Sequence, residues 1–318
     1  MTAEAQIVPG DDRPKPKSSE PLFSVIIPTY NRATLVPRAI ESVLNQSFDS
    51  FELLVLDDGS TDDTAQRVAA VEDPRVRYFR LPRGGAARAQ NIGAQHATGV
   101  FLIFLDSDDE ALPGWLSTIA QNSSRHVALI STDAWSVDET KATRHGAREL
   151  AYPGSGATAQ ILSGTYAIRR SVFESIGGFD DDIPSGTKTD LSIKLVKYLA
   201  DNTEPVVYID TPLVLHHRNS PLSVRLDDRA VLEGAEILLE RYASELVGVP
   251  KIRADFHGVA GVRAVRIGNM KKARQHFLES ARDDPTNPKR WIRLVAAWIP
   301  WADRLWKAPR VSPTQSTN

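Results

Sequence analysis

A cluster of carboxylates follows an apolar run and is the group of residues best suited to metal chemistry. The run 100–105 leads directly into Asp106, Asp108, Asp109 and Glu110. Residues two apart on an extended backbone point the same way, so Asp106 and Asp108 are expected to converge on one Mg²⁺ or Mn²⁺ while Asp109 and Glu110 turn elsewhere. A second interpretation stays open, in which these acids cap the helix that follows.

Two more polar turns follow predicted strands closer to the N-terminus. The apolar runs 23–27 and 51–56 are each followed by a polar turn, the first containing Tyr30 and the second Asp58. Each turn precedes a segment with helical spacing, and strands that alternate with helices predict βαβ units and a mostly parallel sheet. Ligands of such sheets bind beyond the carboxyl ends of the strands, which is where Tyr30, Asp58 and Asp108 fall.

Composition bounds the class of protein. The 318 residues are 42% apolar, enough for one large α/β domain with an appendage or for two domains. A net charge of -2 gives no global reason to expect nucleic-acid binding. The sequence has no cysteine, which excludes disulfides, a thiol nucleophile and cysteine-ligated zinc. We expect a cytoplasmic protein, because neither a signal-peptide pattern nor an apolar run of about 20 residues is present.

Six motifs in a fixed order carry a family resemblance. They are Ser24-Val25-Ile26-Ile27-Pro28-Thr29-Tyr30-Asn31-Arg32, Ser42-Val43-Leu44-Asn45-Gln46-Ser47, Glu52-Leu53-Leu54-Val55-Leu56-Asp57-Asp58-Gly59-Ser60-Thr61-Asp62, Asn91-Ile92-Gly93, Leu105-Asp106-Ser107-Asp108-Asp109 and Gly177-Gly178-Phe179-Asp180. Over roughly residues 21 to 220 the chain resembles the family 2 glycosyltransferases. The resemblance implies a GT-A nucleotide-binding α/β sandwich, here with a helical C-terminal extension.

The resemblance also implies an activity. It indicates an inverting, metal-dependent enzyme that moves a sugar from a nucleoside-diphosphate donor, expected to be UDP-linked, to an acceptor hydroxyl in cell-surface glycan or glycolipid synthesis. Mn²⁺ or Mg²⁺ would serve as Lewis acid. A glycan, a lipid-linked or a small-molecule acceptor all remain open. The alternative is a non-catalytic nucleotide-sugar-binding or assembly protein.

The resemblance assigns residues to the nucleotide sugar and to the metal. The nucleotide-sugar residues are Pro28, Thr29, Tyr30, Asn31, Arg32, Asp58, Arg88 and Asp106. An aromatic face at Tyr30 suits stacking and a carboxylate at Asp58 suits a ring N–H. The metal residues are Asp108, Asp106 and His217. For the pair at 216 and 217 a second interpretation stays open, in which both are partly exposed histidines of a loop without a role at the metal. Arg88 lies two places before the family's usual arginine, so a solvated surface role stays open.

The catalytic base departs from the family pattern. Relatives carry an aspartate where this chain has Lys188, and the next acid of the motif is Asp190. Residues two apart on a helix, such as Lys188 and Asp190, point about 200° away from each other around the helix axis. Asp190 can therefore occupy the position of the family's base only after a register shift. We expect Asp190 to be the base. One of the aspartates at 180–182, or binding without turnover, stays open.

The remaining regions are expected to differ in character. We predict a disordered tail at 1–20, the GT-A domain at 21–225, a helical region with a tetratricopeptide-like helix pair at 226–288 and a Trp/basic segment at 289–318. Residues 289–310 combine four tryptophans and six basic residues with one acid. This composition predicts a contact with an anionic membrane surface, peripheral at the inner face of the plasma membrane. A helix that docks its tryptophans on the protein itself is the alternative.

Overall fold

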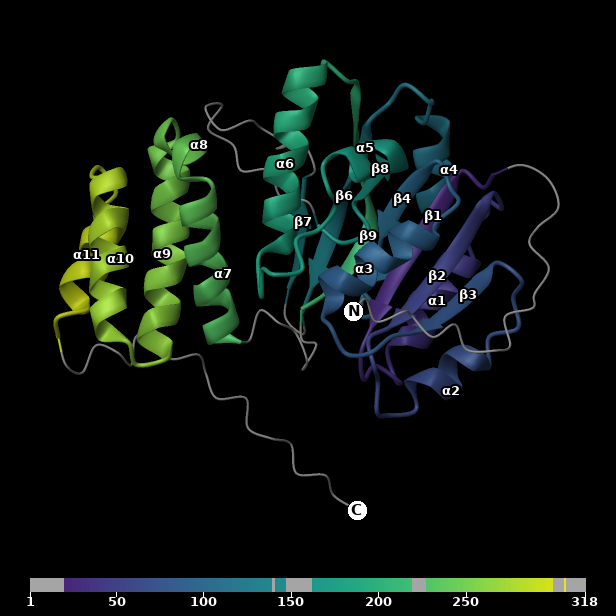
Figure 1. The fold of residues 1–318 in the computed structure, drawn as a ribbon, viewed down its shortest axis with the longest axis horizontal. Coiled ribbons are helices and arrows are strands. Elements are labelled where there is room, and N and C mark those ends of the chain that lie inside the picture. The colour runs from purple at the N-terminus through teal and green to yellow at the C-terminus, as the bar shows by residue number, and fades with distance from the viewer. Residues whose placement is uncertain (1–19, 139–140, 147–161, 219–226, 300–305, 307–318) are drawn as a thin grey trace, which may run out of the picture. The chain divides into compact units, whose positions relative to one another are not determined.

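The chain divides into two compact units in the computed structural model. The residues described are 20–138, 141–146, 162–218, 227–299 and 306. The first unit extends to Asp182 and resumes at Thr187–Pro221, and the second contains Ile183–Gly186 and the chain from Leu222 onward. Most of the expected N-terminal tail lies outside the described residues. Figure 1 shows the elements of both units.

One sheet organises the first unit. Its strands are β1 (Phe23–Thr29), β2 (Phe51–Asp57), β3 (Val76–Arg80), β4 (Phe101–Phe104), β5 (Glu110–Ala111), β6 (Leu129–Val137), β7 (Ala142–His145), β8 (Tyr166–Arg169) and β9 (Val206–His217). The order is β3-β2-β1-β4-β8-β6-β9-β5, with β7 paired to β6. Strands β1 to β4 pair in parallel, whereas β8 is antiparallel to both β4 and β6. The α/β class is confirmed, and the second half of the sheet is more mixed than expected.

Helices cover both faces of this sheet. They are α1 (Val36–Leu44), α2 (Thr64–Ala69), α3 (Ala86–His96), α4 (Trp115–Gln121), α5 (Arg170–Ser175) and α6 (Thr187–Asn202). Alternate residues of a strand point to opposite faces, so Val25 and Ile27 pack with α1 and α4, while Ile26 packs with α3, α5 and α6. Strands β1, β2 and β4 are buried on both sides, which explains their nearly continuous apolar sequences.

The sheet positions the polar turns at one edge. Strand β1 lies between β2 and β4, so the turns after these three strands are neighbours. Asn31 joins two of them, because its N–H donates to Ser60 Oγ at 2.9 Å and its Oδ1 accepts from Thr61 N–H at 2.8 Å. Its φ of 49° is left-handed, a conformation that asparagine tolerates better than most residues.

The second unit is helical. Its helices are α7 (Asp228–Arg241), α8 (Ala243–Val247), α9 (Pro250–Arg266), α10 (Met270–Asp283) and α11 (Pro288–Ala296). The side chains of Asp227, Asn269 and Asn287 accept hydrogen bonds from the first turns of α7, α10 and α11, which fixes where these helices begin. Among the described helices, none is both long and apolar enough to cross a membrane.

Candidate active site

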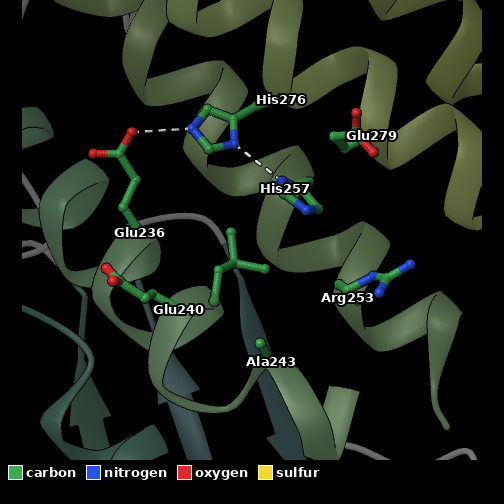
Figure 2. A pocket seen from close by; sticks show the side chains of 8 residues that line it. Glu236, Glu240, Ala243, Arg253, His257, His276 and Glu279 are labelled. Carbon is green, nitrogen blue, oxygen red and sulfur yellow. Dashed lines mark hydrogen bonds and ion pairs between the residues drawn. The ribbon is translucent and has the colours of Figure 1, made fainter. Parts of the chain in front are cut away.

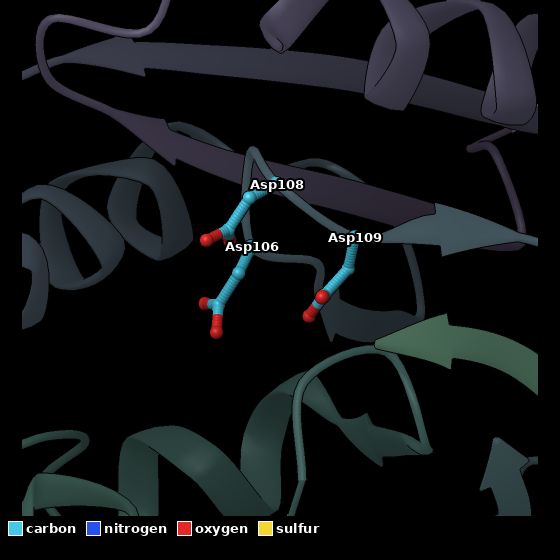
Figure 3. Close-up of side chains that lie close together, drawn as sticks. All are labelled: Asp106, Asp108 and Asp109. Atoms are coloured by element: carbon cyan, nitrogen blue, oxygen red, sulfur yellow. The ribbon is translucent and has the colours of Figure 1, made fainter. Parts of the chain in front are cut away.

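Three carboxylates meet on the turn after β4. One oxygen from each of Asp106, Asp108 and Asp109 lies within 4.8 Å of the others, and the three side chains point to the same side of the turn (Figure 3). The expectation that Asp109 turns elsewhere was wrong. The backbone does not stay extended, since Asp109 N–H donates to Asp106 O at 3.0 Å and closes a tight turn. Glu110 does turn away, to Arg38 at 3.0 Å.

The three aspartates differ in burial and therefore in electrostatics. Asp109 is buried, whereas Asp106 and Asp108 are partly exposed. Burial, reinforced by the charges of Asp106 and Asp108, raises the pKa of Asp109 well above its usual range. Carboxylate oxygens grouped in this way are the donors that Mg²⁺ and Mn²⁺ prefer, and a bound cation would relieve the repulsion. The donor set fits a hard divalent metal ion.

Among the described residues, Lys188 and Arg32 place cationic groups against this cluster. Lys188, in the first turn of α6, places Nζ 2.7 Å from Asp106 Oδ2. Arg32, expected at the nucleotide sugar, places Nη2 3.6 Å from Asp108 Oδ2. The residue at the family's usual base position is therefore the ion-pair partner of a predicted metal ligand, a contact that the sequence reasoning missed.

Asp190 lies in a different environment from the cluster. Its side chain is fully buried, and Oδ2 is 2.7 Å from Lys194 Nζ one turn further along α6. An acceptor hydroxyl cannot reach a carboxylate enclosed in this way without local rearrangement. The role of Asp190 as base stays a prediction, and its burial counts against it. Asp181 and Asp182, two of the alternatives, are exposed.

The predicted nucleobase contacts are joined by an arginine. Asp58 is nearly fully buried and accepts hydrogen bonds from Gly84 N–H at 2.7 Å and Gly85 N–H at 2.9 Å. Arg83 forms an ion pair with the same carboxylate, and its guanidinium carbon lies 3.6 Å from the centre of the Tyr30 ring. The turn 83–85 therefore satisfies Asp58, and Arg83 covers the ring face of Tyr30.

Other predicted nucleotide-sugar residues lie close to these turns. Pro28 and Thr29 are the last two residues of β1 and are buried in the sheet. Arg88 lies on α3 beside the turn 83–85, because a Cβ added to Gly84 would be 2.6 Å from Arg88 Nη1. The role of Arg88 at the nucleotide sugar stays a prediction.

The histidine pair at the end of β9 points in two directions. His217 places Nε2 2.6 Å from Glu110 Oε1, and only its backbone N–H reaches the cluster, at 3.2 Å from Asp109 Oδ1. His216 places Nε2 3.8 Å from Asp109 Oδ2 and 2.8 Å from Ser163 O. Adjacent residues of a strand face opposite sides, so the imidazole nearer the aspartates belongs to His216. The assignment of His217 as a metal ligand stays a prediction.

Comparison with known sequences identifies the N-terminal region. Residues 24–177 match the family described as Glycosyl transferase family 2. The chain is 42% identical over 114 residues to GalNAc(5)-diNAcBac-PP-undecaprenol beta-1,3-glucosyltransferase of Campylobacter jejuni, which covers 35% of this chain and 37% of that protein. It is 40% identical over 95 residues to chondroitin synthase of Pasteurella multocida, covering 29% of this chain and 10% of the synthase. The chain thus spans well under half the length of these curated relatives.

Comparison with solved structures identifies the fold. Staphylococcus aureus TarS 1-349 in complex with UDP-GlcNAc has a TM-score of 0.58 at 18% identity, covering 83% of this chain and 92% of that one. The mannosyltransferase PcManGT from Pyrobaculum calidifontis, in complex with GDP-Man and Mn²⁺, has a TM-score of 0.53 at 19% identity, covering 91% and 84%. At these identities the likeness shows the shared GT-A fold and nothing further.

Proposed function

Because the chain belongs through residues 24–177 to glycosyl transferase family 2, we propose that it moves a sugar from a nucleoside-diphosphate donor to an acceptor hydroxyl, with inversion at the sugar carbon. The observation that carries the proposal is the convergence of Asp106, Asp108 and Asp109 at the carboxyl edge of the sheet. An Mg²⁺ or Mn²⁺ ion held by these carboxylates would neutralise charge on the leaving diphosphate.

The chain's own residues would orient the donor around that edge. Tyr30 and Asp58, which lie on adjacent turns and share Arg83 as partner, would meet the base. Arg88 lies beside the same turn and would contact a phosphate. We propose a UDP-linked donor, since the structural neighbour TarS was solved in complex with UDP-GlcNAc. The neighbour PcManGT was solved in complex with GDP-Man, so a GDP-linked sugar is the competing donor.

We propose a glycan or lipid-linked glycan as acceptor. The support is the names of two relatives: the Campylobacter enzyme is named for an undecaprenol diphosphate glycan and the Pasteurella enzyme for the polysaccharide chondroitin. Both matches cover about a third of this chain or less, and a shared fold does not by itself carry an acceptor with it.

Calorimetric titration of UDP, GDP and dTDP into the full chain, each with and without Mn²⁺, tests the donor site. Binding of UDP that requires Mn²⁺ and is lost in Asp108→Ala is the expected result. Glu110→Ala is the matched control, because this neighbouring acid points away from the cluster toward Arg38 and His217. Folded protein that binds no nucleotide would contradict the proposal.

A second function, nucleotide-sugar binding without efficient transfer, is favoured by one specific contact. Lys188 occupies the usual base position and is paired with Asp106, while Asp190 is buried. Release of free nucleotide from the donor in the presence of acceptor extracts distinguishes the two functions. Metal-dependent donor binding, with no nucleotide release above the Asp108→Ala background, would establish nucleotide-sugar binding without transfer as the function.

We further propose that the protein attaches peripherally to an anionic membrane surface through α11. Large apolar side chains are exposed along this segment: Trp298 by 65%, Ile292 by 64%, Val295 by 61% and Trp291 by 42%. Basic residues at 289 and 293 lie on the same helix, a combination that suits anionic headgroups. The predicted segment continues into 300–305 and 307–318, which lie outside the described residues.

Co-sedimentation with vesicles of anionic and of neutral lipid tests this attachment. Ile292→Ser with Val295→Ser should release the protein from anionic vesicles. Val247→Ser is the matched control, because Val247 is equally exposed, at 66%, on α8. Unchanged sedimentation of the double variant would show that α11 is not the attachment site.

A further inference from the structure

A pocket in the second unit gathers ionisable side chains that the proposed transfer does not use. Its volume is about 390 Å³, and it lies between α7, α9 and α10 (Figure 2). The residues that line it are Glu236, Leu239, Glu240, Ala243, Arg253, His257, His276 and Glu279. Every one of them belongs to the second unit, so the pocket is defined within one compact body.

A chain of contacts fixes the orientation of one imidazole. Lys272 Nζ lies 2.8 Å and 2.7 Å from the two carboxylate oxygens of Glu236. These two contacts hold the Glu236 side chain in place and in its ionised form. Glu236 Oε1 lies 3.2 Å from His276 Nε2. A carboxylate accepts hydrogen bonds, so Nε2 carries the hydrogen and, in the neutral ring, Nδ1 carries the lone pair.

That lone pair meets a second histidine. Nδ1 of His257 lies 3.0 Å from Nδ1 of His276, as the dashed lines of Figure 2 show. With His276 in this neutral tautomer, Nδ1–H of His257 donates this hydrogen bond. If the hydrogen of His257 moves from its Nδ1 to its Nε2, the ring stays neutral. The Nδ1 atoms of His257 and His276 then both carry lone pairs and face each other. Two nitrogens bound tetrahedrally to one zinc ion lie about 3.3 Å apart, close to the spacing found here.

The pocket offers carboxylates to a cation. Three line it, at Glu236, Glu240 and Glu279, of which Glu236 is paired with Lys272 and Glu279 with Arg282. Arg253 is held by Asp283, with Nε 2.8 Å from Oδ2 and a second contact from Nη2, so its charge is already compensated. Burial, followed by the neighbouring His276, lowers the pKa of His257, which keeps this ring neutral near pH 7.

We propose that His257 and His276 bind a divalent transition-metal ion of the zinc class through their Nδ1 atoms. Glu236 is the positioning residue, since it orients His276 from the far side of the ring, as carboxylates do for zinc-bound histidines. The ion would bridge α9 and α10 and so brace the helical unit. This site is independent of the aspartate cluster, whose oxygen donors suit harder cations.

Calorimetric titration of Zn²⁺ into the EDTA-treated full chain, with excess Mg²⁺ present, tests the site. We expect one tight equivalent that weakens by more than about tenfold in His257→Gln and in His276→Gln, and by about tenfold to a hundredfold in Glu236→Gln. The exposed His126 supplies the control, because His126→Gln should bind as wild type does. Asp108→Asn should also bind as wild type does, which separates this site from the aspartate cluster.

Spectroscopy on a chain with an unaltered pocket keeps the proposal testable if the pocket variants do not fold. Cu²⁺ bound at the pocket should show nitrogen hyperfine splitting in a chain in which both His216 and His217 are replaced by Gln. Zinc binding that persists unchanged in the two pocket variants, or an all-oxygen Cu²⁺ signal, would overturn the proposal. Loss of nucleotide binding in Asp108→Ala would leave it untouched, since the two sites share no residue.

Discussion

Replacing Lys188 by Met should tighten metal binding at the aspartate cluster. Lys188 Nζ and Asp106 Oδ2 are 2.7 Å apart, and their side chains are 24% and 34% exposed. A metal ion that binds both oxygens of Asp106 must displace the ammonium group of Lys188. The positive charge of that group also repels the metal ion. Lys188→Met removes both costs without adding a new polar group.

The size of the effect follows from the geometry of the pair. Hydrogen bonds to charged groups contribute about 1.5–3 kcal/mol, and partial exposure places this pair at the lower end. About 1.5 kcal/mol corresponds to a factor of roughly ten in a dissociation constant. We therefore expect Lys188→Met to bind Mn²⁺ roughly tenfold more tightly than wild type at the same pH and ionic strength.

Calorimetric titration of Mn²⁺ into EDTA-treated wild type and variant measures the change directly. Lys197→Met is the matched control, because Lys197 is exposed on the same helix. A control that also gains affinity would show a general loss of positive charge. An unchanged or weaker Kd in Lys188→Met would refute the reasoning and show that Lys188 does not compete with the metal.

Three further predictions concern neighbouring features. The raised pKa of Asp109 means that deprotonation of this carboxyl destabilises the folded state as the pH rises from the carboxyl's ordinary pKa of 3.8 through the raised one, so Asp109→Asn should raise the Tm of EDTA-treated protein at pH 7. Mn²⁺ binds the deprotonated carboxylate, so calorimetry should show Mn²⁺ affinity falling as the pH is lowered toward 3.8. Arg83→Ala should bind UDP about two- to fivefold more tightly by calorimetry, because an exposed cation–π contact of about 0.5–1 kcal/mol no longer covers the aromatic ring; weaker binding would place Arg83 on the nucleotide. Gly261→Ala should lose about 1–3 kcal/mol in urea unfolding, since its Cβ would lie 2.5 Å from the Phe277 ring, whereas Gly248→Ala, with nothing within 4 Å, should not.

The local pattern of the sequence predicts the first half of the sheet well. The apolar runs 23–27 and 51–56 are found in strands β1 and β2, and the polar turns after β1, β2 and β4 do lie at one edge. Strand β9 begins with the apolar run 206–209 and continues to His217 beyond the end of that run. Pro212 hid the continuation, since proline lacks an N–H, and register shifts in β6 around Asp133 accommodate it.

Contacts between distant residues could not be predicted in this way. Lys188 and Asp106 are 82 residues apart, and His257 and His276 come from different helices. Periodicity gives the face of a helix or strand but not which residue of another element it meets. The family pattern directed attention to an acid near 188 and gave no reason to consider a lysine paired with a metal ligand.

The two sides of the candidate donor site share one electrostatic design. Asp58 is paired with Arg83 where a base is expected, and Asp106 is paired with Lys188 where a metal ion is expected. Each ligand must therefore exchange with a cation of the chain, and its measured affinity is the difference between two favourable interactions. Because both cations are partly exposed, salt weakens the internal pairs as well as the ligand contacts. Affinity for a divalent ion should consequently depend less on ionic strength in wild type than in Lys188→Met, in which only the ligand contacts remain to be screened.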